Sequence, residues 1–444
     1  MKPSSYNVII PTESDTFILY NTLKDNILLI DSELKEALEK KSITLPDEYI
    51  PVLKKAGMII DDDVQEDFIY QYMYNSRKFD ASTSYFIIFP TYACNLQCPY
   101  CYEKSGSVLS HSMNVETAEN VSLFMKKMAE ENKSSHILMK LYGGEPLLND
   151  EAIFLIYDAV SKFAKEGIGF HIVLQTNGTL LTAETIDKLS GHLWTVEVTL
   201  EGDKELHDTI RFYKKGGGTY EDIMNAVQLL LQKNIHTALR INASEADHLD
   251  ALLKDMKKRG VGGRNLSFYV TQTSDFGLHE MFTDDALCLR DEKRAVDLIP
   301  ELRAVVDKNG FRQNLTTFDT LQKQKIIPCN FERKGRYVVD PYGDVYLCFF
   351  TAGQKEHSIG TVGQGGTVEW NSNFYDIMKR NPLEFAECQH CALLPMCGGG
   401  CHIRACKNEG TYLAPHCGSI KEMAEERIKL YLRQKYPERF GWLK

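Results

Sequence analysis

The stretch TYACNLQCPYCY at residues 91–102 decides the fold class, because it follows an apolar strand pattern at Tyr85–Phe89 and spaces three cysteines as C-x3-C-x2-C. Three thiolates on one short loop can bind three irons of a cubane cluster, which leaves the fourth iron open to a substrate or cofactor. Barrel enzymes place their chemistry on such loops, at the carboxyl ends of strands. A structural zinc site is the alternative, but zinc takes four closely spaced ligands, and the next candidate is His111.

The strand at Tyr85–Phe89 opens a regular alternation of strand and helix patterns, which predicts parallel pairing through right-handed crossovers. Six units are too few for a complete eight-fold barrel, so we expect an α/β fold with a partial (β/α)6 barrel over residues 84–309. The further expected strands are Ile137–Tyr142, Phe170–Gln175, Val196–Leu200, Thr237–Ile241 and Leu266–Thr271, and the expected helices lie near 113–131, 151–165, 183–189, 219–233, 246–258 and 291–308.

Composition narrows the possible functions of this 444-residue chain. Its formal net charge of −10 argues against bulk electrostatic binding of nucleic acid. No run of eighteen apolar residues predicts a membrane span, and the first residues have no apolar core of a secretory signal, so we expect a cytoplasmic protein. Twelve cysteines in such a chain indicate metal or cluster ligation rather than disulfides.

The first 80 residues predict a small separate unit. Three short strands near Tyr6–Pro11, Thr16–Tyr20 and Asn26–Ile30 are followed by helix patterns that end near Lys40, Gly57 and Arg77. From about residue 310, loops, glycines and cysteines predominate until Cys417, and we expect a final helix from about 420 to 435.

Four motifs in order resemble the signature of the radical S-adenosylmethionine (SAM) enzymes. They are the cysteine triplet with an aromatic residue before its last cysteine, GGEP at 143–146, QTNGT at 175–179 and TLEG…HDTIR at 199–211. Thr199 and Glu201 depart from the usual Ser and Asp of the last motif. The resemblance implies a cluster on Cys94, Cys98 and Cys101, and SAM contacts from Tyr100, Gly143, Gly144, Glu145, Asn177, Thr199 and Arg211, with Thr199 and Arg211 on the SAM carboxylate.

A second group of seven cysteines resembles the SPASM extension, which carries two auxiliary iron–sulfur clusters. By the family pattern, Cys388, Cys391, Cys397 and Cys417 hold one cubane, and Cys329, Cys348 and Cys401 hold the other. The three-membered set is completed by Cys406 or Cys288, or leaves one iron open to a substrate thiolate. Structural zinc is again the alternative. The resemblance thus implies three 4Fe-4S clusters, with residues 310–444 as the SPASM domain.

The element order of residues 1–80 resembles a PqqD-like, winged-helix-like domain that binds the leader of a precursor peptide by strand addition. A structural cap on the barrel is the alternative reading of this region.

Together, these resemblances imply a peptide maturase that cleaves SAM reductively and forms a thioether from a cysteine of a ribosomally made precursor (the sactipeptide and ranthipeptide types). The resemblance also implies an electron donor such as flavodoxin or ferredoxin. We expect no nucleic-acid partner and no membrane partner. The nearest alternative function is that of a maturase that forms carbon–carbon crosslinks. Two alternatives from other functional classes are a non-catalytic electron carrier and a zinc-dependent interaction module.

A sulfatase-type maturase is a further alternative. Such enzymes typically carry an Asp base directly after the cysteine of the G-x4-C segment, where this chain has Phe349. No catalytic residue acting on the peptide is predicted; Tyr142, Tyr269, Gln272 and Asp340 are weak candidates from their positions alone.

Overall fold

The computed structural model describes residues 1–13, 15–40, 45–101, 103, 110–164, 167–243, 245–271, 292–318 and 325–443. The chain forms two compact units. The first comprises Met1–Asp80, Thr320–Lys334 and Asp376–Lys444, and the second comprises Ala81–Asp319 and Gly335–Tyr375. Among the helices that are described, none is both long and apolar enough to cross a lipid bilayer.

The second unit is built on an eleven-stranded sheet in the order β12-β11-β10-β9-β8-β7-β6-β13-β14-β15-β16. The six predicted barrel strands are present and pair in parallel with their chain neighbours. They are β6 (Thr83–Ile88), β7 (His136–Leu141), β8 (Gly169–Thr176), β9 (Leu193–Leu200), β10 (Thr237–Asn242) and β11 (Leu266–Thr271).

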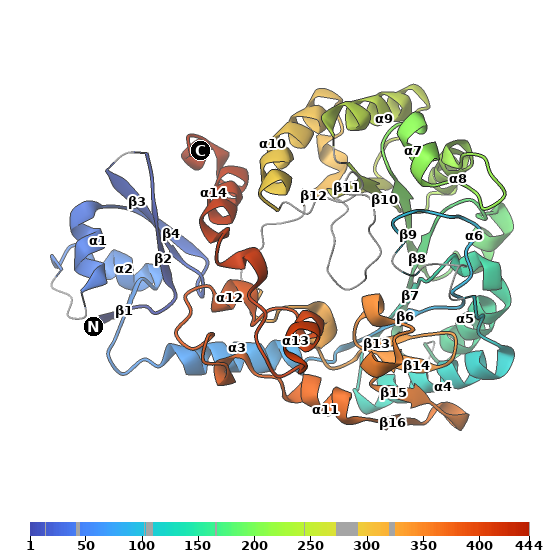
Figure 1. The fold of residues 1–444 in the computed structure, drawn as a ribbon, viewed down its shortest axis with the longest axis horizontal. Helices are drawn as coiled ribbons and strands as arrows, with labels where there is room; N and C mark the ends of the chain where they lie inside the picture. The colour runs from blue at the N-terminus through green and yellow to red at the C-terminus, as the bar shows by residue number, and fades with distance from the viewer. Residues whose placement is uncertain are drawn as a thin grey trace. The chain divides into compact units, whose positions relative to one another are not determined.

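The predicted helices alternate with these strands and lie along the outer side of the sheet (Figure 1). β7 alternates strictly between buried and half-buried residues, because one face packs against helices and the other faces the interior of the partial barrel. The helices are α4 (Val115–Glu131), α5 (Asp150–Ala164), α6 (Ala183–Leu189), α8 (Tyr220–Gln232), α9 (Ala246–Lys258) and α10 (Glu292–Lys308).

The sheet continues past residue 310, where the sequence predicted mainly loops. β12 (Leu315–Phe318) pairs in parallel with β11, and β13 (Arg336–Val339) pairs in parallel with β6 at the other side. β14 (Asp344–Tyr346), β15 (Gly360–Val362) and β16 (Val368–Trp370) add antiparallel strands. These strands have three or four residues, too few for a periodic pattern, and neighbours in the sheet stabilise them.

Helix α7 (Lys204–Ile210) was also not predicted. The side chain of Asp203 caps its first turn by accepting a hydrogen bond from the Leu206 amide.

The first unit begins with the predicted meander. β2 (Asn7–Pro11), β3 (Thr16–Asn21) and β4 (Asn26–Asp31) form a three-stranded antiparallel sheet. Among the described strands, β2 and β4 pair only with β3. The helices are α1 (Ser32–Glu39), α2 (Ile50–Ala56) and α3 (Glu66–Lys78). Asp31 caps α1, and Gly57, where the second helix pattern was predicted to end, ends α2 in the left-handed region, at φ 77°. The strands β1 (Lys2–Pro3) and β5 (Ile59–Ile60) form a separate pair.

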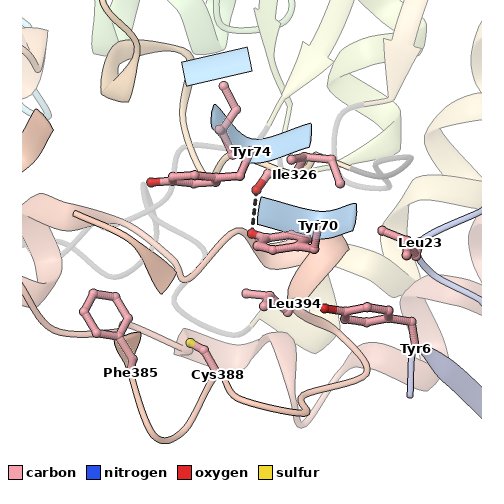
Figure 2. Close-up of a cluster of buried hydrophobic side chains, with 9 residues drawn as sticks. Tyr6, Leu23, Tyr70, Tyr74, Ile326, Phe385, Cys388 and Leu394 are labelled. Carbon is pink, nitrogen blue, oxygen red and sulfur yellow. Dashed lines mark hydrogen bonds between the residues drawn. The ribbon is translucent and has the colours of Figure 1, made fainter. Parts of the chain in front are cut away.

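Residues 1–80 share a hydrophobic core with the cysteine-rich end of the chain, so the compact units do not coincide with the three predicted domains. Tyr6 and Tyr70 pack in one cluster with Cys388 and Leu394, and the Tyr70 hydroxyl donates a hydrogen bond of 2.8 Å to the carbonyl of Ile326 (Figure 2). The C-terminal helices are α12 (Leu394–Cys397), α13 (His402–Glu409), α14 (Ala424–Lys435) and α15 (Pro437–Phe440), and α11 (Ser372–Lys379) precedes them.

Asp340 fixes the turn between β13 and β14. Its carboxylate accepts hydrogen bonds from the backbone amides of Tyr342 and Asp344 and from the Tyr92 hydroxyl, at 2.9, 2.9 and 3.1 Å. Burial and the nearby charge of Asp344 raise the pKa of Asp340 to about 6. This residue, a weak catalytic candidate from sequence, is therefore an anchor of the turn.

A raised carboxyl pKa means that the folded protein holds this proton more tightly, so the Asp340 contribution to stability falls as pH rises from about 4 through 6. Between pH 4 and pH 7, the wild type should lose about 2 kcal/mol of unfolding free energy that an Asp340→Asn variant retains. Thermal unfolding of both proteins at several pH values measures this difference. Parallel pH curves would contradict the assignment.

Candidate active site

The first cysteine loop leaves the carboxyl end of β6 and holds its three thiols half-buried. Burial, with a contribution from the neighbouring thiols of Cys98 and Cys101, raises the pKa of Cys94 to about 12. Burial also raises the pKa of Cys98, and the Arg211 guanidinium opposes that shift. The structure thus brings three thiols and one buried cation together at the carboxyl edge of the parallel sheet.

The paired glycines that follow β7 make room for this loop. Gly143 adopts φ 117°, and a Cβ on it would lie 2.6 Å from the carbonyl oxygen of Thr91. A Cβ on Gly144 would overlap the carbonyl of Ala93, which accepts a 2.8 Å hydrogen bond from the Glu145 amide. The glycines, predicted as SAM contacts, therefore have a structural role that sequence reasoning missed, because they let the backbone before Cys94 approach.

Asn177, another predicted SAM contact, supports the same loop from β8. Its side-chain amide nitrogen donates to Oδ1 of Asn95 at 2.8 Å and lies 3.9 Å from Sγ of Cys94. Its oxygen accepts hydrogen bonds from the amide and hydroxyl of Thr179. Asn95 was not predicted as a site residue, although its position inside the C-x3-C spacing was the available signal.

Glu145 is fully buried between β7 and β8. Its carboxylate accepts hydrogen bonds of 2.7 Å from the Thr176 hydroxyl and from the Asn177 amide. Burial raises the pKa of Glu145, and these hydrogen bonds oppose the shift. Its side chain therefore ties the second motif to the third.

Arg211 lies under the cysteine loop in a polar group with Tyr100 and Glu201. Its Nη1 donates to the Tyr100 hydroxyl at 2.7 Å and lies 3.5 Å from Oε1 of Glu201. Tyr100 in turn donates to Glu201, and Nδ2 of Asn242 donates to both Glu201 oxygens at 3.0 Å. Asn242 on β10, which no sequence motif indicated, thus provides hydrogen bonds for the Glu201 carboxylate, the longer acid at this position.

The guanidinium of Arg211 keeps one donor for a ligand. Within the described part of the chain, its buried Nε has no hydrogen-bond partner. An unsatisfied buried donor on a permanent cation can bind a carboxylate ligand. The role of Arg211 on the SAM carboxylate stays a prediction.

His207 connects the end of β9 to the segment that carries Arg211. Burial and the Arg211 charge lower the pKa of His207 to about 3, so the ring is neutral. Its Nδ1 accepts from the Glu201 amide at 3.3 Å, which places the ring proton on Nε2 towards the Thr219 hydroxyl at 3.1 Å. Thr219 donates to the Arg211 carbonyl at 2.6 Å, so His207 helps to position Arg211.

The interior face of the sheet is polar near the carboxyl edge. Thr199 is half-buried on β9 and pairs in register with Arg240. Nearby strands contribute Lys140 and Glu197, whose charged groups lie 2.7 Å apart. The predicted candidate Tyr269 is the register partner of Arg240 on β11, whereas Gln272 lies outside the described residues.

Tyr142 and Phe349 form an edge-to-face pair, with ring centroids 5.6 Å apart. The position where a sulfatase-type maturase would carry its carboxylate therefore holds an aromatic side chain packed against another aromatic ring.

In the first unit, four of the remaining cysteines lie close together. Burial, with contributions from the nearby thiols of Cys397, Cys417 and Cys391, raises the pKa of Cys388 to about 12. These are the four residues predicted to share one auxiliary cubane. Gathered cysteines fit such a cluster in donor chemistry.

Gly398-Gly399-Gly400, between Cys397 and Cys401, brings the cysteine segments together. All three adopt positive φ, and a Cβ on Gly400 would overlap the carbonyl of His416, directly before Cys417. A Cβ on Gly398 would overlap the backbone at Pro328, directly before Cys329. Sequence reasoning missed this role, although the glycine run was visible.

The remaining cluster residues are placed less completely. Cys329 and Cys401 both belong to the first unit, where burial, with a contribution from the Cys401 thiol, raises the pKa of Cys329. Cys348 lies in the second unit. Cys406 lies on α13, and Cys288 lies outside the described residues. Among the described side chains, no three His, Cys, Asp or Glu converge on a single metal ion. A cubane does not require this, because each of its thiolates binds a different iron.

The fit between Gly144 and the cysteine loop can be tested by substitution. Gly144→Ala should displace the loop, because its Cβ meets backbone rather than a flexible side chain, and should lower iron binding at the first loop about tenfold. Gly262→Ala in the same unit is the matched control, because its Cβ would meet only one ring atom at 4.0 Å. Anaerobic reconstitution with iron counting measures both variants, and full iron binding by Gly144→Ala would contradict the fit.

Comparison with known proteins places this geometry in a family. Residues 88–260 match the radical SAM superfamily. A cysteine-type anaerobic sulfatase-maturating enzyme of Clostridium perfringens is 24% identical over 363 residues, which are 75% of this chain and 92% of that protein. An uncharacterized protein of Archaeoglobus fulgidus is 25% identical over 389 residues, 83% of this chain and 86% of that protein.

Solved structures share the fold. Native anSMEcpe with bound AdoMet and Cp18Cys peptide matches with a TM-score of 0.58 and 20% identity over 80% of this chain and 97% of that chain. Streptococcus suis SuiB bound to the precursor peptide SuiA matches with a TM-score of 0.54 and 14% identity over 93% of this chain and 98% of that chain. Residues 88–260 therefore form a radical SAM domain, and the chain is homologous to the anaerobic sulfatase maturases.

Proposed function

We propose that the chain is a radical SAM maturase that joins a cysteine of a ribosomally made precursor peptide through a thioether. The observation that carries the proposal is the set of three thiols at the carboxyl edge of the parallel sheet, with the unsatisfied Arg211 donor beneath them. When bound, a cluster and SAM supply a 5′-deoxyadenosyl radical, which removes a hydrogen atom from the substrate. The chain's own residues bind and orient these groups.

Within this proposal, Cys94, Cys98 and Cys101 hold the SAM-binding cluster. Arg211 and Thr199 take the SAM carboxylate, and the remaining predicted contacts surround the methionine end of SAM. Burial of Glu145 and Glu201 keeps water away from the base of the site. The later cysteines would hold two auxiliary clusters, which would provide sites for taking up an electron. A flavodoxin or ferredoxin would supply the electron for SAM cleavage.

Two observations on the first unit support the proposal that the substrate is a peptide. SuiB, solved with its precursor peptide, matches 93% of this chain, a larger share than the 80% matched by the sulfatase maturase structure. In the three-stranded sheet, β2 and β4 each leave one edge unpaired by other described strands. An extended leader peptide can add to such an edge through main-chain hydrogen bonds.

The aromatic pair of Phe349 and Tyr142 favours thioether formation over sulfatase-type oxidation of cysteine. A formylglycine-forming enzyme needs a base near the substrate, and an aromatic ring at this position cannot accept a proton. In thioether formation, one C–H and one S–H bond are replaced by one C–S bond, so the peptide loses two hydrogens and keeps its sulfur.

Mass spectrometry of a cysteine-containing precursor modified by this protein tests the reaction. We expect a loss of two hydrogens per link and a cysteine that no longer reacts with iodoacetamide. A loss of two hydrogens with a reactive cysteine would indicate carbon–carbon crosslinking instead, and loss of sulfur would indicate formylglycine formation.

Iron counting tests the cofactors. Anaerobically reconstituted protein should hold about twelve irons per chain if three cubanes form. Replacing Cys94, Cys98 and Cys101 together by Ala should remove about four irons and abolish reductive SAM cleavage, because the SAM-binding cluster is lost. Retained cleavage would refute the assignment of the active cluster.

A further inference from the structure

A group of buried ionisable side chains lies in the first unit outside the sites described above. The side chains of Arg380 and Glu332 have no exposed surface, and those of Lys78 and His402 are 1% exposed. Nη1 of Arg380 lies 3.3 Å from both Glu332 oxygens, and Nδ1 of His402 lies 3.3 Å from Oε2 of Glu332. Nζ of Lys78 lies 3.7 Å from Oε1 of Glu332. We call Lys78, Glu332, Arg380 and His402 the Arg380 cluster.

Arg380 also holds the backbone of the cysteine segments. Its Nη2 donates to the carbonyls of Gly399 and Ala414 at 2.7 and 2.9 Å, and its Nε donates to the carbonyl of Tyr412 at 3.0 Å. Gly399 lies between Cys397 and Cys401, whereas Tyr412 and Ala414 precede Cys417. One guanidinium therefore connects two separate cysteine-bearing segments.

The other members of the Arg380 cluster extend this connection. Glu332 follows Cys329 by three residues, and His402 directly follows Cys401. Lys78 donates to the carbonyls of Ile377 and Arg380 at 2.8 and 2.7 Å. These hydrogen bonds fix the end of α11 and the position of Arg380, which directly follows this helix. The charged group thus contacts segments next to each of the cysteine positions 329, 397–401 and 417.

Stability alone does not account for such a group. Desolvation of buried ions commonly offsets their attraction, so apolar residues of equal volume would serve a purely structural role as well. Arg380 carries a permanent positive charge beside Glu332, and burial lowers the pKa of the neighbouring Lys78 to about 8. The guanidinium of Arg380 hydrogen-bonds to the carbonyl of Gly399, two residues from Cys397 and Cys401, and to that of Ala414, three residues from Cys417, so its charge lies beside the cysteine segments.

We propose that Arg380, held in place by Glu332, is a positioning residue that pre-arranges the cysteine segments of the first unit and supplies positive charge to an anionic auxiliary cluster. The inference rests on the proposed function, because it takes these cysteines as cluster ligands. Groups around a metal ligand commonly change its affinity for metal by about 10–100-fold. Buried charge and hydrogen bonds near a cluster also set its reduction potential.

The test uses the full chain with Cys94, Cys98 and Cys101 replaced by Ala, so that the iron counted belongs to the auxiliary clusters. In this background, Arg380→Met should release iron to a chelator about tenfold faster, because the carbonyl contacts and the charge are lost. Arg439→Met is the matched control, since Arg439 is exposed on α15 in the same unit. Arg380→Lys, which keeps the charge without the three-carbonyl fork, should fall between the two.

Reduction potentials measured by redox titration with electron paramagnetic resonance separate positioning from simple destabilisation. Loss of the positive charge in Arg380→Met should lower the auxiliary potential, and loss of the negative charge in Glu332→Gln should raise it. Glu332→Gln keeps its side-chain volume, so it also serves if Arg380→Met does not fold.

The outcomes are distinguishable. Opposite shifts of potential in the two variants support the inference. A background that binds iron, with release rates and potentials unchanged in both variants, overturns the inference alone. A background that binds no iron overturns the proposed auxiliary clusters, and the inference with them.

Discussion

Close backbone contact between the first cysteine loop and the glycine pair after β7 is the constraint on which the rest of the site depends. A Cβ at either glycine would meet backbone oxygen, which cannot move aside as a flexible side chain can. The contact sets the height of Cys94 above the sheet, and the buried carboxylate of Glu145 then ties the glycine motif to β8. Loops from neighbouring strands therefore meet at one edge as a single assembly.

The same principle recurs in the first unit, where Gly398, Gly399 and Gly400 let one cysteine segment lie against the backbone beside two others. Here a buried cation adds a second kind of constraint. Arg380 donates hydrogen bonds to the carbonyl of Gly399, between Cys397 and Cys401, and to the carbonyl of Ala414, before Cys417. Its hydrogen bonds and its charge therefore act on the same cysteine segments. Both cysteine regions thus combine glycine for proximity with a buried arginine, Arg211 in one case and Arg380 in the other.

The parallel strands of the barrel and most of its helices were predictable because strand and helix patterns alternate regularly along the chain. The caps at Asp31 and Gly57 were predictable because single residues carry that signal. β12 to β16 were not, because strands of three or four residues have no recognisable alternation and depend on their partners. Residues 1–80 looked independent in the sequence, but Tyr6 and Tyr70 complete a core with Cys388 that only the folded chain brings together.

Local signals in the sequence predict the chemistry proposed for this protein: three cysteines in one spacing, ordered motifs after successive strands and a later run of cysteines need no tertiary information to be recognised. The residues that support this chemistry indirectly became apparent only in the folded chain. Folding turned Asn177 towards the cysteine loop, satisfied Glu201 with Asn242 and buried Glu332 beside Arg380. These pairings join residues far apart in the chain, and such contacts exist only after strands and segments have packed.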